Sequence, residues 1–216
     1  SRCFERRIIR LTTDYTDFHR GNNLIHKKYI DEGYDIFYTG ISSSMSSTYQ
    51  NALIAAESVC KERIEVFDSK TLSTGTGLMV LKAVKMRDEG KNIHEIAEHL
   101  TNNVRDNVRA QFLIEQMDYL HKGGRCSALA SFFGRAFHIK PIIRVENGKL
   151  KVFKKPIGRT LNACNALLDI IKSDLANLDL DCVMITSTKA EASEKSFSLR
   201  PVLAYSEGVI FDADTD

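Results

Sequence analysis

Hydroxyl side chains are concentrated in one segment of the chain, Gly40-Ile-Ser-Ser-Ser-Met-Ser-Ser-Thr-Tyr-Gln50. The pattern around it predicts a buried strand over 35–41 and a helix over 48–60. A loop that joins a strand to a helix in this way lies at the carboxyl edge of a parallel sheet, where α/β proteins bind ligands. Helix-start amides and clustered hydroxyls suit an anionic group, either a carboxylate or a phosphate. The structural alternative is that Ser47 and Gln50 form a capping box and the other serines are merely solvated.

A second polar motif, Lys122-Gly-Gly-Arg125, puts two cations around a flexible double glycine. Taken alone, it is equally typical of a helix C-terminus followed by a surface arginine. Cys126 lies beside Arg125, and a cation can lower the pKa of a thiol. A redox sensor centred on Cys126 is therefore one hypothesis, although a buried structural cysteine is the commoner case.

Two other motifs resemble known sites but have the wrong spacing. His94 and His99 are five residues apart, so they diverge by roughly 140° around a helix and cannot chelate one metal ion. Gly75-Thr-Gly77 lacks the third glycine of a dinucleotide fingerprint, and the chain has no GxxxxGK[ST] phosphate loop. We therefore expect no metal and no nucleotide cofactor.

Bulky apolar residues surround Gly134 in the segment Ser131-Phe-Phe-Gly-Arg-Ala-Phe137. Aromatic residues at helical spacing usually form core. A glycine among phenylalanines also leaves room for a ligand chain against the helix, so this segment is a candidate apolar site.

The elements that must position these residues alternate between short β-rich runs and helical stretches, which predicts βαβ units and a largely parallel sheet. Residues 1–138 are predicted to form a Rossmann-like α/β domain that carries the serine-rich loop. Asn147-Gly148 is the strongest short signal for a two-residue hairpin. Antiparallel pairing is therefore expected to begin near His138, and residues 139–216 to form a smaller α+β domain with an antiparallel or mixed sheet.

Composition excludes several classes of protein. The 216 residues include 27% charged and 43% hydrophobic residues, typical of a globular chain, and the net charge of +2 predicts no nucleic-acid binding. The five cysteines are scattered without metal-ligand spacing, which favours reduced thiols. No run approaches the ~20 apolar residues that would span a bilayer. We expect a cytoplasmic protein without stable membrane insertion.

Three segments together resemble the DegV family of bacterial fatty-acid-binding proteins. They are ISSSMSSTYQNA, VFDSKTLSTGTG and YLHKGGRCSALASFFGRAFHIKPIIRVENGKL, followed by Gly158-Arg159-Thr160. The family motifs run ISSxxSGTYQ, a DS before a glycine-rich helix start, and YLxKGGR with IKP about 15 residues further on. The resemblance covers roughly residues 24 to 165, with matching order and spacing.

This resemblance implies a non-catalytic carrier that buries a long-chain fatty acid in an interdomain tunnel, with no cofactor besides that ligand. It also implies that the carboxylate is presented to a partner fatty acid kinase, which makes acyl phosphate for phospholipid synthesis. The alternative is an enzyme, a small-molecule phosphotransfer or hydrolase module that uses the same anion-binding loop. That alternative needs an acid/base or metal cluster near the loop, for which Asp68 and Asp214 are the candidates.

Carried over to this sequence, the resemblance assigns three sets of residues. The carboxylate-binding set is Ser43, Ser46, Ser47 and Thr48, with Ser47 in place of a family glycine. The basic set near the tunnel mouth or the kinase-docking face is Arg125, Lys140 and Arg159. The acyl-tunnel set is Phe112, Phe132, Phe133, Phe137, Ile139 and Ile142.

Two segments depart from the family pattern. The TSQPS element that precedes the serine loop in the family is absent. Asp214 stands where the family carries a histidine that helps to hold the carboxylate, and an aspartate there would repel that group.

Overall fold

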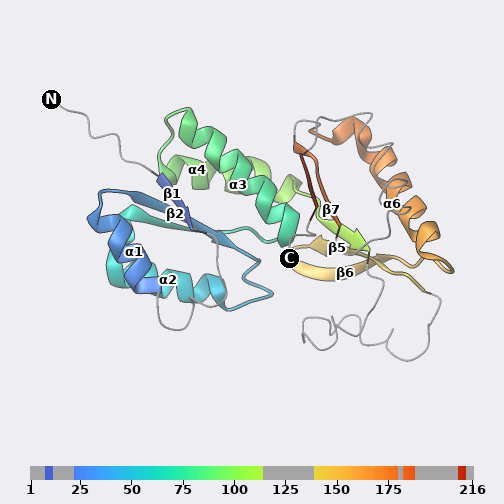
Figure 1. Ribbon diagram of the computed structural model, residues 1–216, viewed down its shortest axis with the longest axis horizontal. Coiled ribbons are helices and arrows are strands. Elements are labelled where there is room, and N and C mark those ends of the chain that lie inside the picture. Colours follow the sequence, from blue (N-terminus) through green and yellow to red (C-terminus); the bar gives the residue numbers. More distant parts are fainter. Residues whose placement is uncertain (1–7, 12–21, 114–138, 180–181, 188–208, 213–216) are drawn as a thin grey trace. The chain divides into compact units, whose positions relative to one another are not determined.

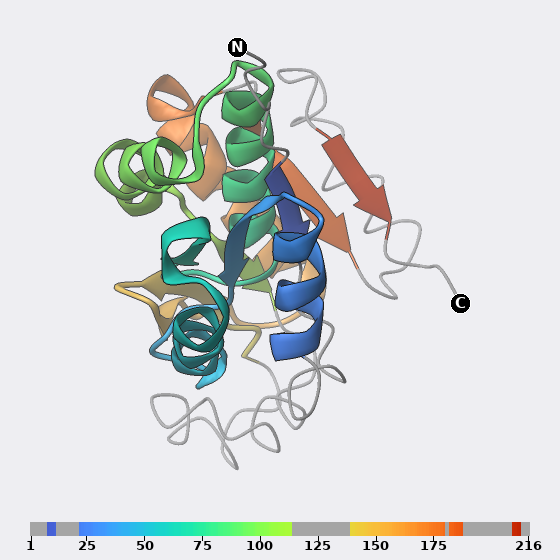
Figure 2. The ribbon, with the colours of Figure 1, turned by 90° about the vertical axis from the view of Figure 1, so that its left-hand side faces the viewer.

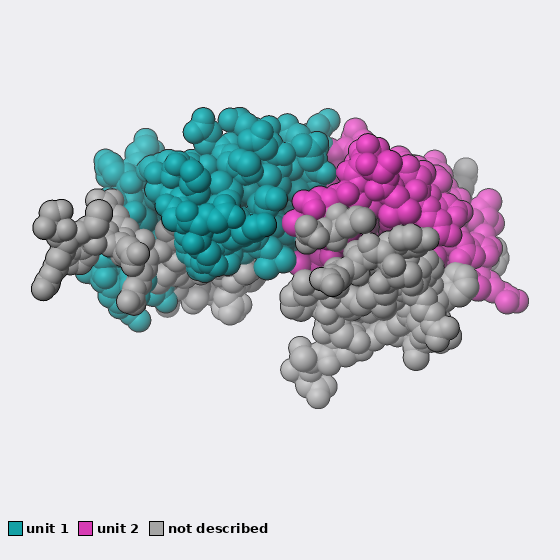
Figure 3. All heavy atoms as spheres, turned by 90° about the horizontal axis from the view of Figure 1, so that it is seen from above, with its two compact units in different colours: residues 1–108, 147–149 teal, residues 109–146, 150–216 magenta. Residues whose placement is uncertain are grey.

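The computed structural model describes residues 8–11, 22–113, 139–179, 182–187 and 209–212. The chain divides into two compact units, which are coloured in Figure 3. Unit 1 comprises residues 1–108 together with 147–149, and unit 2 comprises residues 109–146 and 150–216. The boundary predicted near His138 lies outside the described residues, so that position stays a prediction.

The centre of unit 1 is a parallel sheet in the order β1-β2-β3 (Figure 1). Its strands are β1 (Ile8–Leu11), β2 (Asp35–Gly40) and β3 (Ile64–Asp68). Ile8 pairs with Asp35, and Ile36 with Ile64. Every residue from Asp35 to Thr39 is buried, as expected for a parallel strand that is covered on both faces.

Helices cover both faces of this sheet (Figure 2). Because side chains alternate along β2, Ile36 and Tyr38 pack with α2 (Thr48–Val59), and residues of α1 (Asn22–Asp31) lie against the same cluster. Phe37 points the other way and packs with α3 (Ser73–Asp88) and α4 (Ile93–His99). The parallel α/β fold predicted for the N-terminal part is confirmed.

Local signals account for the start of α4 and the end of α3. Asn92 caps α4 in a reciprocal capping box with Glu95. Gly90 has φ +87° just after α3, the left-handed conformation of a helix-terminating glycine. At Leu100, α4 is followed by a π-helical turn, Leu100–Val104, and then by a 3-10 turn, Arg105–Asn107.

Unit 2 contains a sheet in the order β4-β5-β6, with β4 (Gln111–Leu113) antiparallel to β5 (Ile142–Glu146). β6 (Lys149–Lys154) follows the Asn147-Gly148 turn. Both turn residues have positive φ, +52° and +77°, which confirms the predicted hairpin. Antiparallel pairing begins at Gln111, earlier in the chain than the predicted start near His138.

The rest of the described part of unit 2 comprises α6 (Thr160–Asp174), a 3-10 turn (Leu175–Asn177), and the parallel pair β7 (Met184–Ser187) and β8 (Val209–Asp212). The α+β character predicted for the C-terminal part is confirmed. None of the helices in the described ranges is long and apolar enough to cross a membrane.

Candidate functional site

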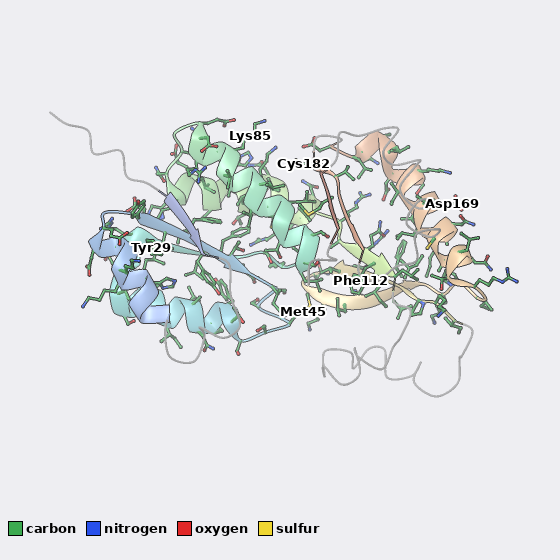
Figure 4. All side chains as sticks on the ribbon, viewed as in Figure 1. Tyr29, Met45, Lys85, Phe112, Asp169 and Cys182 are labelled. Carbon is green, nitrogen blue, oxygen red and sulfur yellow. The ribbon has the colours of Figure 1, made fainter. Side chains whose placement is uncertain are left out.

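The serine-rich segment lies between the end of β2 and the start of α2, as predicted. Met45, labelled in Figure 4, belongs to this loop. Ser42 is fully buried at the start of the loop, and its amide donates to the carbonyl of Thr71, 2.7 Å away. The loop that follows β3 therefore supports the loop that follows β2.

Ser69 adds a second link between these two loops. Its hydroxyl donates to the carbonyl of Gly40 at 2.7 Å, and its oxygen accepts from the amide of Thr71 at 3.2 Å. Ser69 is fully buried and Thr71 nearly so. Sequence reasoning missed both residues as supports of the loop, although the DS dipeptide at 68–69 was the available signal.

Asp68 is the anchor of the serine loop. The amide of Ser43 donates to Asp68 Oδ1 at 3.1 Å, and the Ser43 hydroxyl donates to Oδ2 at 2.5 Å. The amide of Lys70 also donates to Oδ1, at 3.1 Å. Asp68 was nominated from sequence as an acid/base candidate, but these contacts give its carboxylate a structural role, holding the loop.

Ser46 and Thr48 form the polar pair at the helix end of the loop. Their hydroxyl oxygens are 2.7 Å apart, and the amide of Thr48 donates to Ser46 Oγ at 3.2 Å. One hydroxyl donates to the other, which leaves the second O–H free to donate outward. The pair can therefore bind an acceptor such as a carboxylate oxygen beside the positive end of α2.

The capping-box alternative for this loop is wrong. Ser47 precedes α2 in helical conformation and makes no side-chain cap hydrogen bond, so the Ser47–Gln50 box does not form. Instead, the Ser46 hydroxyl oxygen accepts a hydrogen bond from the amide of Thr48, the first residue of α2. Ser47 is exposed, whereas Ser43, Ser46 and Thr48 are half-buried.

The surroundings of the loop are electronegative on the β3 side. Burial raises the pKa of Tyr49, and the carboxylates of Asp68 and Glu65 raise it further against the opposing effect of Arg105. An anion bound at this loop therefore needs direct donors, which the hydroxyls and the α2 amides supply.

The described members of the predicted acyl-tunnel set lie in unit 2. Phe112, labelled in Figure 4, is on β4 and is half-buried. Ile142 on β5 is fully buried, and Ile139 forms an isolated antiparallel bridge with Ile157. Phe132, Phe133 and Phe137 lie outside the described residues.

The predicted basic set is described only in part. The amide of Lys140 donates to the carbonyl of Pro156 at 2.9 Å, and Arg159 is exposed immediately before α6. Arg125, Cys126 and Asp214 lie outside the described residues, so their predicted roles stay predictions.

Metal ligands do not gather in the described part of the chain. No group of three or more His, Cys, Asp or Glu residues that could hold a metal ion occurs in those ranges. The two histidines have different hydrogen-bond partners. His94 Nδ1 lies 2.8 Å from Glu65 Oε2, and His99 Nδ1 lies 3.4 Å from Asn103 Nδ2.

Fold and loop together define an α/β protein of two compact units whose candidate site is a hydroxyl-rich loop at the carboxyl edge of a parallel sheet. Residues 12–200 match the model of a family described as uncharacterised proteins of the DegV family. The chain therefore belongs to the DegV family, as its motifs predicted.

Relatives and solved structures agree with this assignment. A DegV domain-containing protein of Clostridium acetobutylicum is 35% identical over 160 residues, which are 74% of this chain and 57% of that protein. The chain thus spans little more than half the length of that relative. A DegV lipid-binding protein of Thermotoga maritima has a TM-score of 0.72 at 26% identity, covering 88% of this chain and 67% of that one.

A further structure, described as a stearic-acid-binding protein of Eubacterium ventriosum, has a TM-score of 0.74 at 19% identity. The match covers 87% of this chain and 66% of that chain. At this identity the likeness concerns the fold, and it confirms the predicted α/β architecture.

Proposed function

We propose that this chain binds a long-chain fatty acid and holds its carboxylate at the serine loop. The observation that carries the proposal is the Ser46–Thr48 hydroxyl pair, which leaves a donor beside the start of α2. Family membership and a structural neighbour described as lipid-binding support the same conclusion.

The residues of the serine loop have two different roles: some anchor the loop and others bind the ligand. Ser43 was assigned to the carboxylate from the family motif, but its hydroxyl already donates to Asp68. We therefore assign direct contact with the carboxylate to Ser46 and Thr48, and a supporting role to Ser43. Ser47 is exposed and remains available as a further donor.

Affinity and orientation have different sources in this proposal. Burial of about 15 methylenes at ~0.8 kcal/mol each contributes roughly 12 kcal/mol, more than two or three hydroxyl bonds add. Phe112, Ile139 and Ile142 are the described residues that we propose contact the acyl chain. The hydroxyl pair orients the ligand, because a carboxylate left without donors beside apolar surface costs several kcal/mol.

The second part of the proposal is that a partner kinase phosphorylates the bound carboxylate, so that the chain is a carrier and not an enzyme. Arg159 is exposed on unit 2, as a docking residue must be. The phosphotransfer or hydrolase alternative loses its described candidate, because Asp68 is engaged by the Ser43 and Lys70 amides and the Ser43 hydroxyl.

The first experiment is denaturing extraction of the purified protein, followed by mass spectrometry of the organic phase. A stoichiometric C14 to C18 acid supports the proposal and reports chain preference. An empty extract, together with no binding of added palmitate or oleate, would overturn it.

Carrier activity needs a separate test. Protein loaded with radiolabelled palmitate is incubated with ATP and a bacterial fatty acid kinase, and hydroxylamine traps any acyl phosphate as a hydroxamate. The expected result is label in the hydroxamate when carrier and kinase are both present. Label formed by the carrier and ATP without the kinase would instead make this chain an enzyme.

A further inference from the structure

The turn at residues 147–149 belongs to unit 1 and lies against the start of the serine loop. Gly148 is buried although it occupies a hairpin turn, a place that is normally exposed. A Cβ atom at position 148 would lie 2.5 Å from Ser42 Oγ and 3.3 Å from Ser44 Oγ. The first distance is too short for a real Cβ contact and the second is tight, so a side chain at position 148 requires the Ser42 hydroxyl to shift.

Ser42 has little freedom to move away from such an atom. Its side chain is fully buried, and its Oγ accepts a hydrogen bond from the amide of Ser44 at 3.2 Å. Its own amide is bonded to Thr71. Rotation of the Ser42 side chain would therefore release the Ser44 amide at the first bend of the loop.

We propose that Gly148 is a positioning residue for the serine loop: the absence of a side chain lets the turn close on Ser42 and hold the loop in its ligand-binding conformation. This inference deepens the proposed function and rests on it where fatty-acid affinity is the measurement. It adds Ser42 and Gly148 to the residues on which carboxylate binding depends, although neither contacts the ligand in the proposal.

A matched control separates this packing effect from backbone strain. Gly148 has φ +77°, so any substitution there is strained. Gly90 has φ +87° in the same unit, and a Cβ atom at position 90 would meet nothing within 4 Å. Gly148→Ala and Gly90→Ala thus share the strain, and only the former introduces the contact with Ser42.

The experiment is a double-mutant cycle with two measurements: the dissociation constant for palmitate and the hydrogen-exchange rate of the Ser44 amide. Gly148→Ala is expected to weaken palmitate binding at least tenfold and to accelerate Ser44 exchange at least fivefold. Gly90→Ala should change each by less than twofold. In a Ser42→Ala background the atom at 2.5 Å is gone, so adding Gly148→Ala should change either quantity by less than twofold.

Two results would overturn the inference: equal effects of Gly148→Ala and Gly90→Ala, or a full effect of Gly148→Ala in the Ser42→Ala background. If the unmodified protein binds no fatty acid, the proposed function fails. The exchange rate of the Ser44 amide then decides the positioning role by itself.

Discussion

The hydroxyl of Ser43 donates to Oδ2 of Asp68 at 2.5 Å while the amide of Ser43 donates to Oδ1 of the same carboxylate. One residue of the β2–α2 loop is thus bound twice by the last residue of β3. An ionised acceptor makes these bonds stronger than neutral ones. The conformation of the serine loop consequently depends on a carboxylate from the neighbouring strand.

Asp68→Ala is expected to lower the free energy of unfolding by about 2 kcal/mol, because it removes charge-assisted bonds to the loop. It should also weaken fatty-acid binding, since the loop loses its anchor. Urea unfolding and palmitate titration measure the two effects. Asp88→Ala is the control, because the exposed Asp88 pairs only with the adjacent Arg87 in the described contacts. Equal stability of the two variants would contradict the anchoring role.

Ser46→Ala should weaken palmitate binding by about 1 kcal/mol, or roughly fivefold, through loss of one hydroxyl of the donor pair. Displacement of a fluorescent fatty acid measures this change. Ser58→Ala is the matched control, because Ser58 bonds the carbonyl of Ala55 on the same helix. Unchanged affinity in Ser46→Ala would remove Ser46 from the site.

Arg63→Lys should cost about 2 kcal/mol of unfolding free energy. The guanidinium donates to Asp35 Oδ1 at 2.8 Å and to the carbonyls of Ile30 and Tyr34 at 3.1 and 2.6 Å. A lysine ammonium cannot reproduce this planar arrangement of donors. Urea unfolding tests the prediction, with the exposed Lys61→Ala as control. If Arg63→Lys lowers the free energy of unfolding no more than Lys61→Ala does, the planar arrangement of the guanidinium donors is unimportant for stability.

His26 should make unit 1 less stable in acid. Burial lowers the pKa of His26 below its ordinary 6.5, and its Nδ1 has no hydrogen-bond partner among the described residues. The unfolded chain therefore binds a proton near pH 6.5 that the folded chain resists, so the free energy of unfolding falls as the pH drops below about 7.

The expected loss between pH 7.5 and 5.5 is at most about 1.4 kcal/mol relative to His26→Gln, which cannot titrate. Urea unfolding of both proteins at the two pH values measures it. His99→Gln should keep the acid sensitivity of the unmodified protein. Identical pH dependence in the unmodified protein and His26→Gln would show that His26 is protonated without cost.

Local patterns predicted those parts of the fold that depend on local physics. The apolar run of β2, the helix over Thr48–Val59 and the Asn147-Gly148 turn follow from burial pattern and backbone preference. The capping box at Ser47 was wrong, because Ser46 is the residue whose oxygen accepts from the Thr48 amide. Ser46 and Ser47 are neighbouring residues of the same type, so the sequence motif alone cannot show which of them bonds the first amide of α2.

Motifs and residue patterns alone were enough to predict the family, the α/β class and the loop that forms the candidate site. Tertiary structure decided which hydroxyls of that loop are engaged and which are available. Ser43 is bonded to Asp68 at the end of β3, and the amide of Ser42 is bonded to Thr71 in the loop that follows. Ser42 also packs against the turn at 147–149, and all three of these segments are distant from the serine loop in sequence. Contacts of this kind depend on packing in three dimensions, and no periodicity or spacing along the chain encodes them.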